Sequence, residues 1–179
     1  MESAGPRVDI ALDSQCLTYL IDALEGVGPP TDALAEQRIA LVRTYLYTQG
    51  TLWITPTVER EFKLIRDRAK RDRHVSWTNT IFGVRRLNDA AAITRRAAKL
   101  SVLHGGERDC LIVAEAEDIR AGTLLTFDAD LERRLAPSAE LLLARPAPFW
   151  ASLGVVRGAT PNKVPSSDNP LADQDWWRW

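Results

Sequence analysis

The chain has 179 residues, 45% of them hydrophobic and 26% charged, as expected for one α/β domain with a buried core. It contains no run of about 18 apolar residues and no basic, apolar leader, which excludes a membrane span and a secretory signal and predicts a cytoplasmic protein. The two cysteines, Cys16 and Cys110, are too few for a disulfide framework or a zinc site. Both lie in apolar segments, where we expect them to be buried and unreactive.

Short apolar runs alternate with helical stripes along the chain. Residues 8–12 (VDIAL) are typical of a buried strand, and the apolar stripe from Leu17 to Leu24 predicts a helix after it, with Ser14 as its N-cap. The further elements expected are helices at about 32–47, from Pro56, at 84–101, 107–120 and 129–135, and strands at 51–55, 123–126 and 141–143. This alternation predicts a three-layer α/β/α sandwich with a central parallel sheet of four to five strands.

The composition changes near the C-terminus. We expect residues 1–154 to form the domain and residues 155–179 a tail. Residues 160–179 contain three prolines and show no periodicity, which is typical of a disordered segment. Trp176, Trp177 and Trp179 instead predict docking, on this domain or on a partner, and we expect the tail to pack on the domain.

Carboxylates follow the predicted strands. In an open α/β sheet, ligands bind at the carboxyl ends of the parallel strands. Asp13 directly follows the first strand, Glu59 and Glu61 lie in the first turns after the second, Asp109 lies in the first turn of the helix that leads to the third, and Asp128 and Asp130 directly follow the third. The sequence therefore brings acids from four chain segments to one edge of one sheet.

Acids gathered in this way require neutralisation. Two carboxylates about 4 Å apart repel by roughly 4 kcal/mol at an effective dielectric constant of 20. Hard divalent cations with oxygen ligands would neutralise them, and the presence of only two histidines argues against zinc. A bound cation can activate water and stabilise charge on a phosphodiester, so the pattern predicts metal-assisted phosphodiester hydrolysis.

Each acid also has a purely structural interpretation. Asp13 is suited to cap a helix, Asp109 to complement a helix dipole, and Asp128 to occupy a turn. Their joint occurrence at one edge of the sheet is what favours catalysis.

Four short blocks within about residues 8–153 resemble the PIN-domain nucleases, which include the VapC-type toxins of bacterial toxin–antitoxin pairs. The blocks are VDIALDSQCLTYLIDAL, ITPTVEREF, HGGERDCLIVAEAE and LLTFDADLERRL. By position, the resemblance implies that the catalytic residues are Asp13, Glu61, Asp109 and Asp128, with Glu59 as the alternate to Glu61 and with Glu107, Asp130 and Thr126 in support.

The resemblance further implies a PIN-like sandwich, a requirement for Mg²⁺ or Mn²⁺, and endonucleolytic hydrolysis, mostly of RNA. Asp13, Asp109 and Asp128 would hold the metal, and Glu61 would bind it or orient the attacking water. An antitoxin protein and a homodimer are the implied partners, and a toxin and a housekeeping ribonuclease both remain open. Family members often have Asn two residues after the first Asp, where this chain has Gln15.

Positive charge is concentrated in one part of the chain. Residues 60–99 contain twelve Lys or Arg against four acids, although the net charge of the whole chain is −1. Such segregation predicts a surface for a polyanion, and a solvated helix face is the alternative. The residues expected to grip nucleic acid are Lys63, Arg66, Lys70, Arg71, Arg85 and Arg86. Trp77 could stack a base or belong to the core, and His104 could contact substrate or make a structural hydrogen bond.

The residues favour a nuclease over two kinds of alternative function. A haloacid-dehalogenase-like phosphatase would have a second Asp where Gln15 stands, and no GxxxxGK[ST] loop for a nucleoside triphosphate is present. Another magnesium-dependent phosphoesterase stays open. A non-catalytic PIN-like module that binds RNA or protein would tolerate loss of the acids, yet every expected acid is present.

Overall fold

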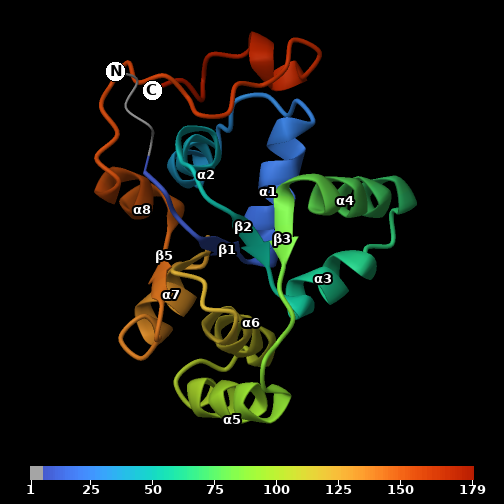
Figure 1. Ribbon diagram of the computed structural model, residues 1–179, viewed down its shortest axis with the longest axis vertical. Coiled ribbons are helices and arrows are strands. Elements are labelled where there is room, and N and C mark those ends of the chain that lie inside the picture. The colour runs from blue at the N-terminus through green and yellow to red at the C-terminus, as the bar shows by residue number, and fades with distance from the viewer. Residues whose placement is uncertain (1–5) are drawn as a thin grey trace.

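The computed structural model describes residues 6–179 and contains five parallel strands between two layers of helices (Figure 1). The strands are β1 (Ile10–Leu12), β2 (Leu52–Ile54), β3 (Phe82–Val84), β4 (Thr123–Leu125) and β5 (Leu142–Ala144), in the order β3–β2–β1–β4–β5. This three-layer α/β/α sandwich confirms the predicted fold class. Residues 1–5, which belong to the predicted 1–154 domain and to the segment expected to lack a leader, lie outside the described residues.

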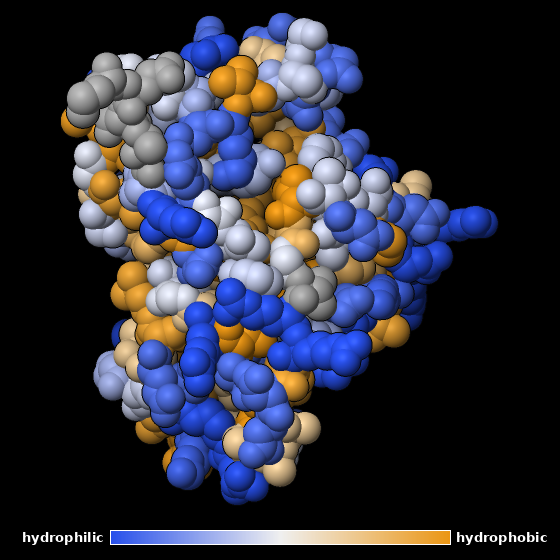
Figure 2. Space-filling view, viewed as in Figure 1, coloured by the Kyte–Doolittle hydropathy of each residue, from blue (hydrophilic) through white to orange (hydrophobic). Residues whose placement is uncertain are grey.

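Helices cover both faces of the sheet (Figure 1). One face carries α1 (Ser14–Leu24), α2 (Ala35–Tyr47) and α4 (Arg68–Ile81), and the other carries α6 (Glu107–Asp118), α7 (Ala129–Leu135) and, outside α6, α5 (Ala90–Ser101). The helix α3 (Pro56–Lys63) contacts both α4 and α6, and α8 (Pro146–Ser152) packs against α2. Figure 2 shows hydrophilic side chains over the outer surfaces of α4 and α5.

The centre of the sheet is apolar and positions the site. All three residues of β1 have no exposed surface, which fits a strand buried between two helical layers. The chain moves outward in one direction from β1 to β3 and in the other from β4 to β5, so the strand order reverses between β1 and β4. A sheet of this kind forms its ligand crevice at the carboxyl ends of those two strands. Asp13 and Asp128 lie shortly after them.

The structure contains one strand that the sequence did not predict, and one helix that begins later than predicted. Residues Phe82–Val84 form β3, whereas a helix was expected over 84–101; that helix, α5, begins at Ala90, with the Asp89 side chain as its N-cap. Gly83 pairs with Trp53 of β2, and a Cβ at Gly83 would lie 2.3 Å from the Trp53 ring. The absence of a side chain at Gly83 therefore leaves space for the Trp53 indole. Glycine is also rare inside strands, so its presence makes this strand hard to predict from the sequence.

Two local predictions at helix starts and ends were wrong. Asp13, not Ser14, is the N-cap of α1, because its side chain accepts a hydrogen bond from the Cys16 N–H. The spacing of Val58, Phe62 and Ile65 predicts that all three face inward from the helix that begins at Pro56, but this helix ends at Lys63, and Ile65 packs on the core from the loop before α4.

The C-terminal tail packs on the domain, as expected. Trp177 is 1% exposed and donates its indole N–H to the Leu171 carbonyl, 2.9 Å away, beside the short 3₁₀ helix η1 (Pro170–Asp173). Arg43 of α2 donates to the Trp177 carbonyl at 3.0 Å, and the rings of Trp179 and Trp150 pack edge to face. The boundary at residue 154 remains a sequence prediction. Within residues 6–179, no helix is long and apolar enough to cross a membrane.

Candidate active site

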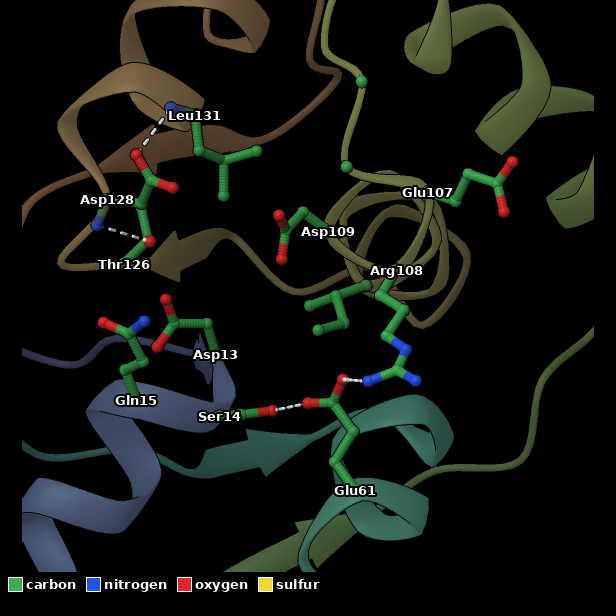
Figure 3. A pocket seen from close by; sticks show the side chains of 13 residues that line it. Asp13, Ser14, Gln15, Glu61, Glu107, Arg108, Asp109, Thr126, Asp128 and Leu131 are labelled. Atoms are coloured by element: carbon green, nitrogen blue, oxygen red, sulfur yellow. Dashed lines mark hydrogen bonds and ion pairs between the residues drawn. The ribbon is translucent and has the colours of Figure 1, made fainter.

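Carboxylates from four chain segments line one hollow of about 620 Å³. The hollow lies at the carboxyl ends of β1 and β4, where the strand order reverses. The acids with side chains on its wall include Asp13, Glu61, Asp109 and Asp128, together with Glu107 (Figure 3). The structure thus brings together the four residues that the sequence singled out as catalytic.

Asp13 is the most buried acid of the hollow. It is 9% exposed, and its Oδ1 accepts a hydrogen bond of 2.7 Å from the Cys16 N–H at the start of α1. Burial raises the pKa of the Asp13 carboxyl, and the charge of Asp109 adds to the increase, although hydrogen bonds from Thr126 and Cys16 oppose it. The site therefore holds a carboxylate whose negative charge is incompletely compensated by the protein.

Asp128 caps α7 with one oxygen and faces the hollow with the other. Its Oδ1 accepts hydrogen bonds from the backbone N–H groups of Asp130 and Leu131, at 2.8 and 3.0 Å. The second oxygen points toward Asp109 (Figure 3). Thr126, which has no exposed surface, accepts a hydrogen bond of 3.0 Å from the Asp128 N–H and also bonds Asp13. The threonine hydroxyl therefore connects the acids that follow β1 and β4.

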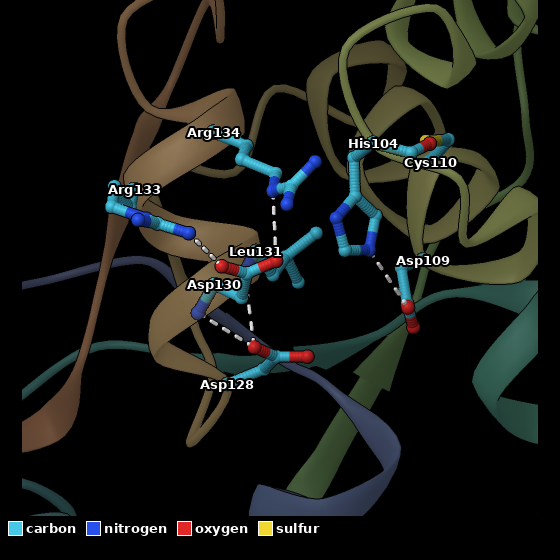
Figure 4. Close-up of polar contacts among 8 residues, drawn as sticks. All are labelled: His104, Asp109, Cys110, Asp128, Asp130, Leu131, Arg133 and Arg134. Atoms are coloured by element: carbon cyan, nitrogen blue, oxygen red, sulfur yellow. Dashed lines mark hydrogen bonds and ion pairs between the residues drawn. The ribbon is translucent and has the colours of Figure 1, made fainter.

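Asp130 does not line this hollow. Its carboxylate is paired with Arg133 and, at 2.8 Å, with Arg134, which both belong to α7 (Figure 4). The hydrogen bond from Arg133 is the main cause that lowers the pKa of Asp130. The Asp130 carboxylate is therefore engaged by arginines, and its backbone N–H is the group that it donates to Asp128.

Asp109 lies in the first turn of α6, on the side of the hollow opposite Asp128. Its Oδ2 lies 3.3 Å from Nε2 of His104, whose side chain is 11% exposed (Figure 4). Glu107 also lines the hollow, but its carboxylate points away from the other acids (Figure 3). The geometry therefore places Asp109, rather than Glu107, among the central carboxylates.

The neighbours of Glu61 and Glu59 show which of the two glutamates faces the hollow. The Ser14 hydroxyl donates to Oε2 of Glu61, and the Arg108 guanidinium lies 3.9 Å from Oε1 (Figure 3). Glu59 is instead paired with Lys63 at 2.5 Å on the same helix, outside the lining of the hollow. Glu61 is the glutamate that α3 brings to the site.

The donor chemistry of the hollow suits Mg²⁺ or Mn²⁺. Asp13, Asp109 and Asp128 offer carboxylate oxygens alone, and the raised pKa of Asp13 identifies a charge that a cation would neutralise. Over residues 6–179, no three His, Cys, Asp or Glu side chains are grouped closely enough to hold a metal ion. Mg²⁺ commonly binds one or two carboxylates and keeps several waters, so its binding does not require such a group.

The basic residues predicted to grip nucleic acid differ in their surroundings. Arg71 and Arg85 donate to backbone carbonyls of Ile65 and Ile119, and Arg85 also lies 3.9 Å from the centre of the Trp53 ring. Lys63 is paired with Glu59, as described above. The other three predicted residues, Arg66, Lys70 and Arg86, have exposed or half-buried side chains, and no hydrogen bond or ion pair of these side chains is seen within residues 6–179. Trp77 is half-buried against the core and donates to Glu25, which favours its structural interpretation.

Two residues of the hollow were missed by the sequence analysis. Arg108 is 79% exposed at the rim, and Ser14 was assigned to a helix cap rather than to Glu61. Arg108 precedes Asp109 at a helix start, and a cation there next to a predicted metal ligand is a signal that could have been used. No sequence signal connects Ser14 with Glu61, because the two are 47 positions apart.

Comparison with known proteins finds similarity at the level of structure and none at the level of sequence families. No protein-family model matches the chain, and no curated protein sequence matches it. Among solved structures, it is similar to a chain in the crystal structure of VapBC2 from Rickettsia felis bound to a DNA fragment from their promoter. That similarity has a TM-score of 0.48 at 16% identity, and covers 75% of this chain and 96% of that chain.

Proposed function

We propose that this protein is a metal-dependent endoribonuclease that hydrolyses phosphodiester bonds of RNA in the cytoplasm. The observation that carries the proposal is the convergence of Asp13, Glu61, Asp109 and Asp128, from four chain segments, on one hollow at the switch point of the sheet. Carboxylates gathered without matching cations are costly for stability, so their presence favours a function.

Asp13, Asp109 and Asp128 would hold Mg²⁺ or Mn²⁺, one or two of them directly and the rest through water bound to the ion. The bound ion would lower the pKa of water and stabilise negative charge on the phosphodiester. Asp13 contributes a buried carboxylate fixed by Cys16, and Asp128 contributes the oxygen that does not cap α7. The Thr126 hydroxyl fixes the two acids relative to each other.

Glu61 would orient the attacking water and accept its proton. The Ser14 hydroxyl fixes Oε2, while Oε1 faces the exposed Arg108 guanidinium. Arg108 stands at the rim, where it would bind a phosphate of the RNA backbone. Arg66, Lys70 and Arg86 would bind the backbone further from the hollow, through charge rather than through base recognition.

The proposal extends to a toxin of a type II toxin–antitoxin pair. The resemblance of the four sequence blocks to VapC-type toxins supports this extension and implies an antitoxin protein and a homodimer as partners. Induced expression of the wild-type chain is then expected to arrest growth, and expression of the Asp109→Asn variant is not. Growth that continues despite active nuclease in the cells would refute the toxin assignment and leave the nuclease intact.

The nuclease itself is tested with labelled single-stranded RNA in Mg²⁺, Mn²⁺ or EDTA. Asp109→Asn and Asp128→Asn are compared with Asp130→Asn, whose carboxylate lies close by but faces the arginines of α7. We expect cleavage that requires metal, is lost in the first two variants and is retained in the third. Cleavage that persists in Asp109→Asn or in EDTA would refute the assignment.

A further inference from the structure

Among residues 6–179, His104 is the one histidine that contacts a carboxylate of the acidic hollow. It lies in the connection between α5 and α6, and its Nε2 is 3.3 Å from Oδ2 of Asp109 (Figure 4). A carboxylate only accepts hydrogen bonds, so Nε2 must carry the hydrogen of this contact. The imidazole thereby occupies one oxygen of Asp109 and leaves the other free.

The backbone around His104 is fixed on both sides. Its N–H donates to the Leu100 carbonyl at the end of α5, at 3.1 Å, and its own carbonyl accepts a weak hydrogen bond of 3.3 Å from the Cys110 thiol. The side chain is 11% exposed. The ring is therefore held in place by elements on both sides of the loop, rather than swinging freely at the surface.

Gly106 leaves the room that this contact needs. A Cβ at Gly106 would lie 2.5 Å from Oδ2 of Asp109 and 2.8 Å from Nε2 of His104, closer than real Cβ contacts occur. Gly106 is also the N-cap of α6 and makes no side-chain cap hydrogen bond. An ordinary capping residue such as Ser or Asp would satisfy the helix better but would push the two side chains apart.

We propose that His104 is a positioning residue that orients the carboxylate of Asp109 for binding a divalent cation. This inference rests on the proposed function, because it assigns Asp109 to the metal. Hydrogen bonds to ligating carboxylates fix their direction and preserve their charged form, and loss of such contacts commonly costs about 10–100-fold in metal affinity or activity. A purely structural histidine would affect folding stability and leave the affinity of the folded protein for metal unchanged.

The experiment measures Mn²⁺ binding to the full chain by calorimetry, without RNA, beside the thermal midpoint in EDTA. The variants are His104→Ala, His104→Gln and Gly106→Ala. His74→Gln is the matched control, because His74 is the other histidine of the chain and is fully buried between the Thr18 hydroxyl and the Lys70 carbonyl. The Gln amide can place an N–H near the position of Nε2, so it preserves the proposed contact.

We expect His104→Ala and Gly106→Ala to weaken Mn²⁺ binding by about 10–100-fold. His104→Gln should retain most of the affinity, and His74→Gln should lower the thermal midpoint without changing the affinity of the folded protein. If His104→Ala does not fold, the Gly106→Ala and His104→Gln variants carry the test.

Three results would overturn the inference. The first is wild-type Mn²⁺ affinity in a folded His104→Ala or Gly106→Ala variant. The second is an equal loss in the Gln and Ala variants of His104, which would show that the hydrogen bond is not what matters. The third is a wild-type protein that neither binds Mn²⁺ nor cleaves RNA, and only this result also refutes the proposed function.

Discussion

Replacing Asp13 by Asn is expected to stabilise the metal-free protein while it removes RNA cleavage. The Asp13 carboxyl is almost completely buried, and burial raises its pKa despite hydrogen bonds from Cys16 and Thr126. Asn can replace both contacts: its Oδ1 can accept from the Cys16 N–H, and its amide can donate to the Thr126 oxygen, which in the wild type donates its O–H to Asp13 instead. The substitution thus removes the buried charge and leaves the cap of α1 in place.

The expected gain is on the order of 2 kcal/mol in free energy of unfolding at neutral pH. A buried polar group whose hydrogen bonds only partly compensate its burial costs about 1–3 kcal/mol. For a chain of this length, about 2 kcal/mol corresponds to roughly 4–8 °C in Tm. Such a gain is expected where a charge is kept for activity at a cost in stability, as the proposed function implies for Asp13.

The sign of the pH dependence follows from the raised pKa. The folded state holds the Asp13 proton more tightly than the unfolded state, so the wild type loses stability as pH rises through the folded pKa. Above that pKa the penalty is complete, and below the ordinary pKa of aspartate, about 4, it is absent. The advantage of Asp13→Asn is therefore largest at every pH above the folded pKa and shrinks as the solution is acidified toward the ordinary pKa of aspartate.

The assay is thermal or urea unfolding in EDTA from about pH 4, near the ordinary pKa of aspartate, to about pH 8. Asp67→Asn is the matched control, since Asp67 also caps a helix, α4, by accepting from a backbone N–H, but is exposed. Asn and Asp cap helices about equally well, so the control should stay within about 0.5 kcal/mol of wild type or be slightly less stable. A destabilised Asp13→Asn protein, or a gain that does not depend on pH, would refute the reasoning.

Three further predictions address the water-orienting residue, the rim and the tail. Glu61→Gln should reduce the rate of RNA cleavage by about 10²–10⁴-fold, whereas Glu59→Gln, whose partner is Lys63, should cleave nearly as wild type. Arg108→Ala should raise KM more than it lowers kcat, and should reduce the salt dependence of RNA binding by about 0.7 in the log–log slope, measured by anisotropy in EDTA. Trp177→Ala should lower the free energy of unfolding by about 3–5 kcal/mol in urea titrations, with half-buried Trp176→Ala costing clearly less.

The sheet edge could be predicted from the sequence because the strands themselves are unambiguous. Residues 8–12 and 123–126 are apolar runs that end in Asp13 and, two residues on, Asp128. Parallel strands of one sheet end at the same edge, whichever strands are adjacent. The prediction that these two acids lie at one edge therefore holds even if the predicted strand ends are wrong by a residue or two. The same reasoning did not depend on knowing the strand order.

The strand β3 could not be predicted, because what makes it a strand is contact across the sheet. Phe82-Gly83-Val84 is three residues long and has a glycine at its centre, which depletes the strand signal. Its stability comes from pairing with β2, where Gly83 makes room for the Trp53 indole. The cation of Arg85 then covers that ring from outside. None of these contacts is periodic in the sequence.

The choice between Glu59 and Glu61 required both local and distant information. Residues two apart on a helix point in nearly opposite directions, so only one of the two could face the hollow. The spacing of Glu59 and Lys63 is that of an exposed ion pair, which is a local sign against Glu59. The Ser14 hydroxyl, which fixes Glu61, comes from another element and could be assigned only from the structure.

If the proposed function is correct, the two ends of α1 contribute differently, one to catalysis and the other to stability. Its N-terminal end carries Asp13 into the hollow, and at its C-terminal end the Leu24 carbonyl accepts a hydrogen bond of 3.1 Å from Asn169 of the tail. The helix has 11 residues and is therefore about 16 Å long. Trp177, buried next to the tail segment that this bond anchors, is far enough from the acids to act on them only through the global stability of the domain. A folded Trp177→Ala protein should therefore keep the wild-type kcat, because the tail stabilises the domain without contacting the residues that line the hollow.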